Sequence, residues 1–456
     1  MSISKKHVIS WIFTLGIPLI LMLIPTNDVY TPQIRIYCAI TLMAIIMFAV
    51  ENVNQAAVSI MLPIAYIILN IVPAEVALSP WLSSTPWMIW GGLLLSNVME
   101  STGLLQRIAY KCMVLTGGTY FGILIGLALA GWILNFFIPS QACLPMAVLA
   151  YSICKALDLG LSKASAGIIL SAAAGALLPL MFMYGPSVAV VYTTGMSVTG
   201  DAAPSWTEFL IQNLVSVLFL VVMVLLYAKM FKPETHINGK DYFVAKYAEL
   251  GKMSLKEKKC LGVCLFLVMA ILTTNIHGVA IGWVFTFIPC TCYWPLINIG
   301  SKDDIKNVNY SMLLFVVACT SIGTVASALG VGQIITDMSM PIIEGKSMWF
   351  VAGFVWILCV VLNFLMTPLA IWGAVTAPLT SIALSIGMNP EALYMVIYHA
   401  CDQIIFPYEN VYYLIFFSFG AMKLSHFAKG MAVKMLVNFI FVMGILVPYW
   451  MLIGFI

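Results

Sequence analysis

Charged side chains are scarce in this chain. Of its 456 residues, 9% are Asp, Glu, Lys or Arg, whereas 62% are hydrophobic. A typical soluble domain contains about 25% charged residues, so the composition excludes an ordinary soluble protein. The net charge of +3 is also too small to indicate a nucleic-acid partner. These shortages favour a protein that lies largely within a membrane.

Spaced sets of metal ligands or paired cysteines are also missing. The chain has eleven cysteines, and almost all of them lie within apolar stretches. The closest pairs, Cys260 with Cys264 and Cys290 with Cys292, do not match the spacing of a zinc site or a disulfide framework. We interpret them as small helix-packing residues, and we expect neither a metal nor a cofactor.

Long apolar runs, by contrast, recur along the whole chain. A helix of about 20 residues crosses the hydrocarbon core of a bilayer, so the sequence predicts an all-α polytopic membrane protein with about eleven crossings. The first run follows Lys5 and Lys6 and lacks a small-residue cleavage site, so we expect a retained helix. The expected spans are 8–25, 32–50, 54–73, 84–112, 164–200, 205–230, 259–276, 278–299, 309–338, 391–421 and 427–455.

Two further apolar stretches, 117–158 and 347–388, are interrupted near their centres by turns that contain proline. The first turn is Ile138–Gln141 and the second is Met366–Leu369. Proline lacks a backbone N–H and ends a helix, so each stretch reads as two half-helices. We expect each pair to be a re-entrant hairpin that leaves the membrane on the side from which it entered.

Charge asymmetry between loops predicts the orientation of these spans. If the N-terminus is cytoplasmic and both hairpins are re-entrant, all of the 21 Lys and Arg except Arg35 and Lys346 lie on the cytoplasmic side. Such an excess is the usual pattern of cytoplasmic loops. The sequence therefore predicts a multi-pass protein of the inner (cytoplasmic) membrane. This count includes Lys434, and it is equally compatible with hairpins that cross completely.

The two halves of the chain repeat one another. Segment 137–148 aligns with 364–375, and Gly160 aligns with Gly387. The first hairpin enters from the cytoplasm and the second from outside, which predicts an inverted-topology repeat with a site at the repeat interface. The expected organisation is N-terminal scaffold helices at 1–80, a first repeat at 81–230 with a hairpin at 117–158 and a broken helix at 164–200, a cytoplasmic linker at 231–258, and a second repeat at 259–456 with a hairpin at 347–388 and a broken helix at 391–421.

One apolar span of the second half contains two carboxylates, Asp402 and Glu409, beside Pro407. Ionisable residues at membrane depth indicate function, because lipid does not solvate them. Three interpretations stay open: proton carriers in place of sodium, carboxylates held by backbone donors in a structural role, or direct ligands of a cation. His399 is either a proton relay or a hydrogen-bonded packing residue.

The corresponding break of the first half, Tyr184 to Ser187, contains no carboxylate, and no Lys or Arg lies near either hairpin tip. The N-termini of half-helices can bind an anion without cationic side chains. Each polar residue could equally form an interhelical hydrogen bond. The predicted substrate or ion contacts are Ser140, Gln141, Tyr184, Gly185, Ser187, Thr367, Pro368, Asp402, Pro407, Glu409 and Asn410. The proton-coupling candidates are Asp402, Glu409 and His399.

We favour a structural interpretation for two other features of the sequence. Glu100 and Arg107 lie seven residues apart near the end of the fourth span, and we interpret them as a structural pair. The lysine-rich stretch 231–259 is interpreted as a linker, with binding of anionic lipid headgroups as the alternative.

Four stretches, in order along the chain, resemble the divalent-anion:sodium symporter family, whose members carry dicarboxylates, citrate or sulfate. They are Trp90–Ala109, Glu249–Lys259, Ile386–Pro390 and Pro448–Gly454. The resemblance implies a transporter of small anions that forms a homodimer.

The hairpin tips depart from the pattern of that family, in which a Ser-Asn-Thr motif at each tip holds sodium and a substrate carboxylate. Here the tips are Ser140–Ala142 and Thr367–Leu369. Ala142, Pro368 and Leu369 offer no side-chain oxygen. The chain therefore resembles a divergent member that lacks these motifs, and the coupling ion, H+ or Na+, stays open.

Together these features predict a secondary active transporter of small anions, such as di- or tricarboxylates, and not an enzyme. It would be proton-coupled or an exchanger, with elevator-like alternating access. The expected partners are a small anionic substrate and membrane lipid. The alternatives are a cation/proton antiporter on a related fold, a transport-inactive membrane protein, or a channel.

Overall fold

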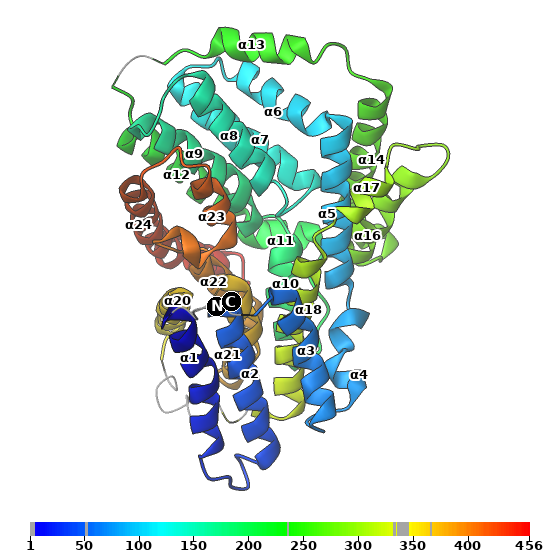
Figure 1. Ribbon diagram of the computed structural model, residues 1–456, viewed down its shortest axis with the longest axis vertical. Coiled ribbons are helices and arrows are strands. Elements are labelled where there is room, and N and C mark those ends of the chain that lie inside the picture. The colour runs from blue at the N-terminus through cyan, green and yellow to red at the C-terminus, as the bar shows by residue number, and fades with distance from the viewer. Residues whose placement is uncertain (1–4, 51–52, 235–236, 332–333, 335–345, 365–366) are drawn as a thin grey trace.

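The computed structural model describes residues 5–50, 53–234, 237–331, 334, 346–364 and 367–456. Its regular elements are helices, and one isolated β-bridge joins Thr119 to Asn238 (Figure 1). Before the linker they are α1 (Lys5–Met22), α2 (Pro32–Val50), α3 (Gln55–Ile68), α4 (Ala74–Ala77), η1 (Ser79–Leu82), α5 (Ser84–Thr102), α6 (Leu104–Leu115), α7 (Tyr120–Phe137), α8 (Cys143–Ala156), α9 (Lys163–Leu177), η2 (Leu178–Met181), α10 (Pro186–Thr199), α11 (Trp206–Asn213), η3 (Leu214–Ser216) and α12 (Val217–Met230). After it come α13 (Lys240–Glu249), α14 (Leu255–Leu272), α15 (Thr274–His277), α16 (Ile281–Cys290), η4 (Thr291–Tyr293), α17 (Lys302–Lys306), α18 (Tyr310–Ala328), α20 (Met348–Asn363), α21 (Pro368–Ser385), α22 (Pro390–Cys401), η5 (Pro407–Glu409), α23 (Val411–Ser418), α24 (Leu424–Phe441), η6 (Val442–Leu446) and α25 (Val447–Leu452).

Several of these helices are long and apolar enough to cross a membrane. In the described part of the chain there are six such segments: Tyr120–Phe137, Lys163–Thr199, Trp206–Met230, Lys302–Ala328, Pro368–Ser385 and Leu424–Leu452. Shorter apolar helices, among them α3, α8 and α20, accompany them. The prediction of an all-helical, multi-pass membrane protein is confirmed.

Each half contains a helix–turn–helix unit followed by a helix that is interrupted. The first unit is α7 and α8, and the second is α20 and α21. A hydroxyl side chain begins both units, because Thr119 accepts from the N–H of Gly122 and Ser347 accepts from the N–H of Phe350. Such caps satisfy donors that have no partner inside the helix. The same local chemistry thus starts the same element in both halves.

The interrupted helices break over short stretches. The first runs as α9 to Leu177, turns through η2, and resumes as α10 at Pro186. The second runs as α22 to Cys401, turns through η5, and resumes as α23 at Val411. Proline fixes φ and lacks an N–H, so it suits the first position of a helix and removes a backbone hydrogen bond when it lies inside one. The breaks leave the last carbonyls of α9 and α22 without partners in their own helices.

Close packing of α7 on α9 brings the first turn against the first break. A Cβ atom on Gly131 of α7 would overlap the backbone of Gly175 in α9. Only glycine permits this approach of two backbones. The end of α7 therefore lies within hydrogen-bond reach of the last carbonyls of α9.

The linker packs against the first half through an ion pair. Arg107 Nε donates to Glu257 Oε1 at 2.6 Å, and its guanidinium also donates to the carbonyls of Leu250 and Gly251. The predicted pair of Glu100 with Arg107 is wrong. Helix α5 ends at Thr102, and Gly103, with φ of 85°, turns the chain before α6 begins. The seven-residue spacing therefore does not lie on one continuous helix.

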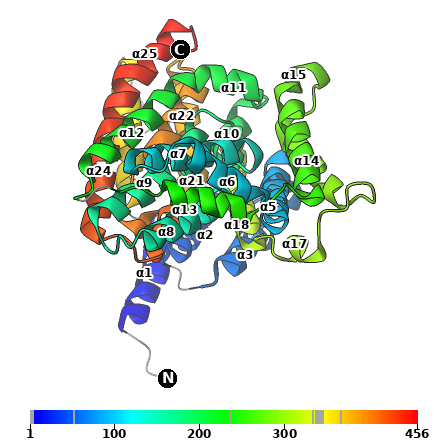
Figure 2. The same cartoon turned by 90° about the horizontal axis from the view of Figure 1, so that it is seen from above.

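The remaining helices surround these units. Helix α13 lies across the outside of α6 (Figure 1), and α14 and α16 pack against α5 (Figure 1). Helix α14 also lies beside α5 in the second view (Figure 2). A second apolar cluster joins α2 and α3 to α18, where Phe48 packs edge-on against Phe315 at 4.7 Å. The hydroxyl of Tyr37 in α2 also donates to the carbonyl of Ile322 in α18.

Candidate functional site

A cavity of about 420 Å³ lies where the two turns and the two breaks meet. Its volume falls within the range of small-molecule sites, roughly 300–1,000 Å³. The structure brings seven of the predicted contacts to its wall. They are Ser140, Gln141, Ser187, Thr367, Pro368, Asp402 and Asn410.

Four other predicted contacts lie outside the residues that line this cavity. Tyr184 is buried among aromatic rings and packs edge-on against Tyr192 and Phe209. Gly185 precedes α10, and Pro407 begins η5. Glu409 is 2% exposed and turns its carboxylate toward its own backbone. These four residues belong to the two breaks but do not line the cavity.

One end of the cavity has a polar, exposed rim. Helix α18 begins there, at Tyr310, and α5 ends there, near Glu100. The exposed rim residues are Gln55, Glu100, Asn307, Asn309 and Ser311. At the opposite end α10 and α18 pack closely, with Ser197 Oγ 3.3 Å from Ser327 Oγ. The exposed rim of the cavity thus lies at the end where α18 begins. At the other end, Ser197 and Ser327 line a second cavity of about 170 Å³.

Three helices begin at the cavity without a capping side chain. They are α8, α10 and α21, whose preceding residues Ala142, Gly185 and Thr367 form no cap hydrogen bond. The wall residues Cys143, Ser187 and Pro368 lie in their first turns. Free N–H groups and the positive end of the helix dipole make such termini suited to an anion.

Four further donors at the wall have no hydrogen-bond partner among the described residues. Trp372 Nε1 and Tyr412 Oη are two of them. The other two, on the hairpin turns, are the buried atoms Gln141 Nε2 and Thr367 Oγ1. A buried polar atom without a hydrogen bond is costly, so it is usually satisfied by water or a ligand. The two donors on the turns are therefore candidate ligands for an anion in the cavity.

Asn135 of α7 ties the first turn to the first break. Its amide nitrogen donates to the carbonyls of Gly131 and Ala176, each at 2.9 Å, and its oxygen accepts from the N–H of Ser140. Ser140 has a left-handed φ of 67°, which is uncommon for a residue other than glycine. Its hydroxyl lies 2.9 Å from the hydroxyl of Ser187. The amide thereby holds the strained turn against α9.

Asn363 of α20 has a similar role in the second half, one residue beyond the position that the repeat pairs with Asn135. Its amide nitrogen donates to the carbonyls of Cys401 and Gln403, each at 3.0 Å, and of Ala400 at 3.2 Å. The carbonyls of Cys401 and Gln403 are ones that the second break leaves without helical partners, whereas that of Ala400 also accepts from the N–H of Gln403. Sequence reasoning missed both asparagines, although each is a lone amide just before a turn. That placement was the available signal.

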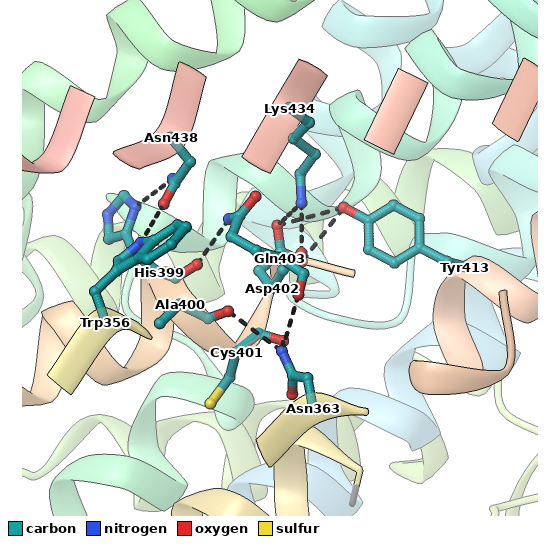
Figure 3. A network of polar contacts seen from close by, with 10 residues as sticks. All are labelled: Trp356, Asn363, His399, Ala400, Cys401, Asp402, Gln403, Tyr413, Lys434 and Asn438. Carbon is teal, nitrogen blue, oxygen red and sulfur yellow. Dashed lines mark hydrogen bonds and ion pairs between the residues drawn. The ribbon is translucent and has the colours of Figure 1, made fainter. Parts of the chain in front are cut away.

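Asp402 lies at the wall within a charged network (Figure 3). Its carboxylate is 2.5 Å from Lys434 Nζ, and the hydroxyl of Tyr413 donates to both carboxylate oxygens at 3.3 Å. Lys434 also donates to the backbone carbonyl of Asp402 and lies 5.0 Å from the centre of the Tyr413 ring. Asp402 is thus not a lone carboxylate.

Lys434 corrects two expectations from the sequence. It is 1% exposed within α24, and not in a cytoplasmic loop as the charge count assumed. It also supplies a cationic side chain behind the second break, where none was expected. The signal lay in α24 itself, since a lysine inside an apolar segment requires a partner.

His399 belongs to a neighbouring network that fixes its tautomer (Figure 3). The indole N–H of Trp356 can only donate, so it must face the oxygen of Asn438, at 3.0 Å. The amide nitrogen of Asn438 therefore donates to His399 Nδ1, at 3.1 Å. His399 accepts at Nδ1, so any proton on the neutral ring sits on Nε2. This geometry supports the packing interpretation of His399.

Glu409 acts as an internal cap in the second break. Its carboxylate accepts from the N–H of Phe406 at 2.7 Å and from that of Ile405 at 3.3 Å. Of the three interpretations of the carboxylates, this arrangement matches the structural one. Asp402, which faces the cavity, is the carboxylate that a ligand could reach.

Comparisons with known proteins agree with this architecture. The family model for the sodium:sulfate symporter transmembrane region matches residues 5–456. Among solved structures, the YdaH transporter of Alcanivorax borkumensis matches with a TM-score of 0.54 and 13% identity over 99% of each chain. MtrF of Neisseria gonorrhoeae, from a class of antimetabolite efflux pumps, matches with a TM-score of 0.49 and 11% identity over 98% of this chain and 95% of MtrF. No curated protein matches the chain. The likeness to YdaH shows a shared fold.

Proposed function

The chain belongs to the sodium:sulfate symporter family, and from that premise we propose that it is a secondary active transporter of small anions, such as di- or tricarboxylates. One observation carries the choice of an anion. Three helices begin at the cavity without side-chain caps, and Gln141 and Thr367 add unpaired donors to the same wall. A wall rich in free donors suits a ligand that only accepts.

The charge of the wall is compatible with a dianion. Asp402 would repel such a substrate if it were unpaired, but Lys434 neutralises it. Glu100 carries its charge at the exposed rim, where water screens it. The interior of the cavity therefore carries no net negative charge that would exclude an anion.

The proposed mechanism is elevator-like alternating access. The hairpins α7–α8 and α20–α21, together with the breaks, would form the moving unit, and α5, α14, α16 and α18 would belong to the scaffold. The exposed rim supports access to the cavity from the end where α18 begins. With the N-terminus and the linker placed in the cytoplasm, the open end faces inward.

The remaining architectural proposals follow the repeat. The two hairpins are re-entrant and related by inverted topology, and the site lies at the repeat interface. The domains are those expected from the sequence: scaffold 1–80, first repeat 81–230, linker 231–258 and second repeat 259–456. We place the protein in the inner membrane as a homodimer, in line with its resemblance to the family.

We propose proton coupling or anion exchange as the source of energy, with Asp402 as the titrating group. Asp402 lies at the wall, whereas Glu409 and His399 are both engaged by structural partners. Protonation of Asp402 would remove its negative charge, leave the positive charge of Lys434 uncompensated, and so change the electrostatics of the cavity. This gives substrate binding a means of responding to protons.

Uptake by purified protein in proteoliposomes tests the proposal. Radiolabelled dicarboxylates, citrate and sulfate would be offered under imposed pH gradients, imposed sodium gradients, or an internal load of the same anion. We expect uptake of at least one anion that responds to the pH gradient or to internal anion. Uptake driven by sodium and indifferent to pH, and unchanged in Asp402→Asn, would contradict the coupling.

The same vesicles distinguish the rival functions. A cation/proton antiporter would show cation-dependent proton flux, lost in Asp402→Asn, with no effect of any anion. A transport-inactive protein would show neither flux nor a thermal shift with any anion. Either result would overturn the proposal of anion transport.

A further inference from the structure

The carbonyl oxygens released by the two breaks are already occupied by donors of the protein itself. Asn135 binds the carbonyl of Ala176 at the first break. Asn363 binds those of Ala400, Cys401 and Gln403 at the second. Unwound carbonyls of this kind are what a transporter commonly offers to a coupling cation. Here the side-chain amides of Asn135 and Asn363 donate to these carbonyls in place of a cation.

The second break therefore offers a sodium ion few free oxygens. Among its described side chains, the amide oxygens of Asn363 and Gln403 are buried without a hydrogen-bond partner. Sodium requires a cage of oxygen ligands, yet Pro368 and Leu369 at the adjacent turn have no side-chain oxygen. The carboxylate of Glu409 is engaged by the N–H groups of Phe406 and Ile405. Among the described residues near this break, Asp402 is the one that presents both a carboxylate and a released carbonyl to one cation.

The cation that Asp402 binds in this structure is the ammonium group of Lys434. In an uninterrupted helix the carbonyl of Asp402 would accept from the N–H of Phe406, but Glu409 has captured that N–H. Lys434 Nζ donates to this released carbonyl as well as to the carboxylate. The ring face of Tyr413, 5.0 Å away, completes a set of contacts that favours a positive charge. An ordinary ion pair would need only the carboxylate.

We propose that Lys434 is a tethered cation that permanently fills a cation position at the second break, so that this half of the site takes no cation from solution. The inference rests on the proposed transporter function, and it deepens that function by assigning the cation of the second half to the chain itself. Helix α24 supplies the ammonium from outside both the hairpin and the broken helix (Figure 3).

The test measures cation binding without measuring transport. The melting temperature Tm of detergent-purified protein would be followed while choline chloride is replaced by NaCl at constant ionic strength. Wild type should not respond specifically to sodium. Lys434→Met empties the position and leaves Asp402 unpaired, so we expect a saturable, sodium-specific rise in Tm on the order of 1–3 °C.

Two controls sharpen the test. Asp402→Asn with Lys434→Met removes both charges and should abolish the sodium response. Lys429→Met changes an exposed lysine of the same helix and should behave as wild type. If Lys434→Met does not fold, Lys434→Leu takes its place, because its side chain also fills much of the volume and donates no hydrogen bond to Asp402.

The outcomes separate this inference from the proposed function. A saturable sodium-specific rise in wild type would overturn the inference, because the position would then be open to solution. A folded Lys434→Met or Lys434→Leu protein that ignores sodium would overturn it as well. Failure of wild type to transport any anion would instead defeat the proposed function and leave these Tm measurements readable.

Discussion

The two breaks of this protein are built alike and charged differently. At each, the helix before the turn ends near an asparagine, Asn135 or Asn363, whose amide nitrogen donates to carbonyls of the broken helix. The backbone presents the same problem in both halves, since a break leaves carbonyls that membrane lipid cannot satisfy. In both halves, the side-chain amide of an asparagine supplies a hydrogen-bond donor to these carbonyls.

The two breaks differ in the polar side chains that accompany this asparagine. The first break has two hydroxyls, Ser140 and Ser187, in mutual contact. The second has a buried ion pair of Asp402 with Lys434, and the carboxylate of Glu409 caps its backbone. The neutral amides therefore satisfy released carbonyls at both breaks. The charged side chains described here lie at the second break. Protonation of a carboxylate at the second break can therefore change the charge of the cavity wall while the first break stays neutral.

The largest effect should come from breaking the ion pair that distinguishes the halves. Lys434→Ala leaves the carboxylate of Asp402 buried without a counter-charge, which typically costs about 3–5 kcal/mol. Thermal unfolding in detergent would show a large fall in Tm. Asp402→Asn combined with Lys434→Met should cost less than Lys434→Ala alone, with the exposed Lys429→Met as control. Equal losses in the single and double variants would contradict the role of pairing.

The next largest effect tests what the halves share. Asn135→Leu and Asn363→Leu each leave released carbonyls without a donor, and we expect each to lose about 1–3 kcal/mol. Because the two amides do the same work, the two falls in Tm should be similar. The matched control is Gln106→Leu at an exposed position of α6. A loss confined to one half would show that the amides are not equivalent.

A third variant compares the buried pair with the ion pair at the linker. Arg107 and the N–H of Ser254 stabilise the charged carboxylate of Glu257, which lowers the pKa of Glu257 from its usual value. A lowered folded-state pKa stabilises the protein above the unfolded-state pKa, and this stability is lost as the pH falls through the folded-state pKa.

Glu257→Gln should therefore lower Tm at neutral pH, by the equivalent of about 1–2 kcal/mol, and the gap to wild type should narrow in the acid range. Measurements of Tm between neutral and acid pH would check this. Glu249→Gln, at an exposed acid of the linker, is the control. A gap that widens toward acid pH would show that the sign is wrong.

The smallest effect on stability should come from the unpaired donors at the wall. Gln141→Ala in the first turn and Thr367→Ala in the second each remove one hydrogen bond to the anion. We expect a fall in anion affinity of about five- to tenfold for each, with Tm without anion almost unchanged. Competition uptake would measure the affinity, and Ser152→Ala on α8 is the control. Loss in only one variant would place the anion against that turn alone.

Much of the site could be predicted because its parts are marked locally. The turns and the breaks are marked by prolines within apolar stretches, and the structure brings seven of the predicted contacts to one cavity. The partners of those residues were not predictable in the same way. Lys434 lies 32 residues beyond Asp402 on a different helix, and nothing in its local sequence indicates which carboxylate it meets.

Distance along the chain also explains the error at Glu100 and Arg107. A helical spacing predicts contact only if the helix is continuous, and Gly103 turns the chain between them. Arg107 instead meets Glu257, 150 residues away, after α14 has packed beside α5. Contacts of this kind depend on the packing of helices and not on periodicity.

The sequence by itself determined the membrane environment, the all-helical architecture and the places where helices stop. These follow from composition, from the length of apolar runs and from proline, all of which act within a few residues. Only the tertiary structure decided which charges meet and which donors stay free. A carboxylate in an apolar span must find a partner, but the partner depends on how α20, α22 and α24 pack together. That packing made Asp402 half of an ion pair.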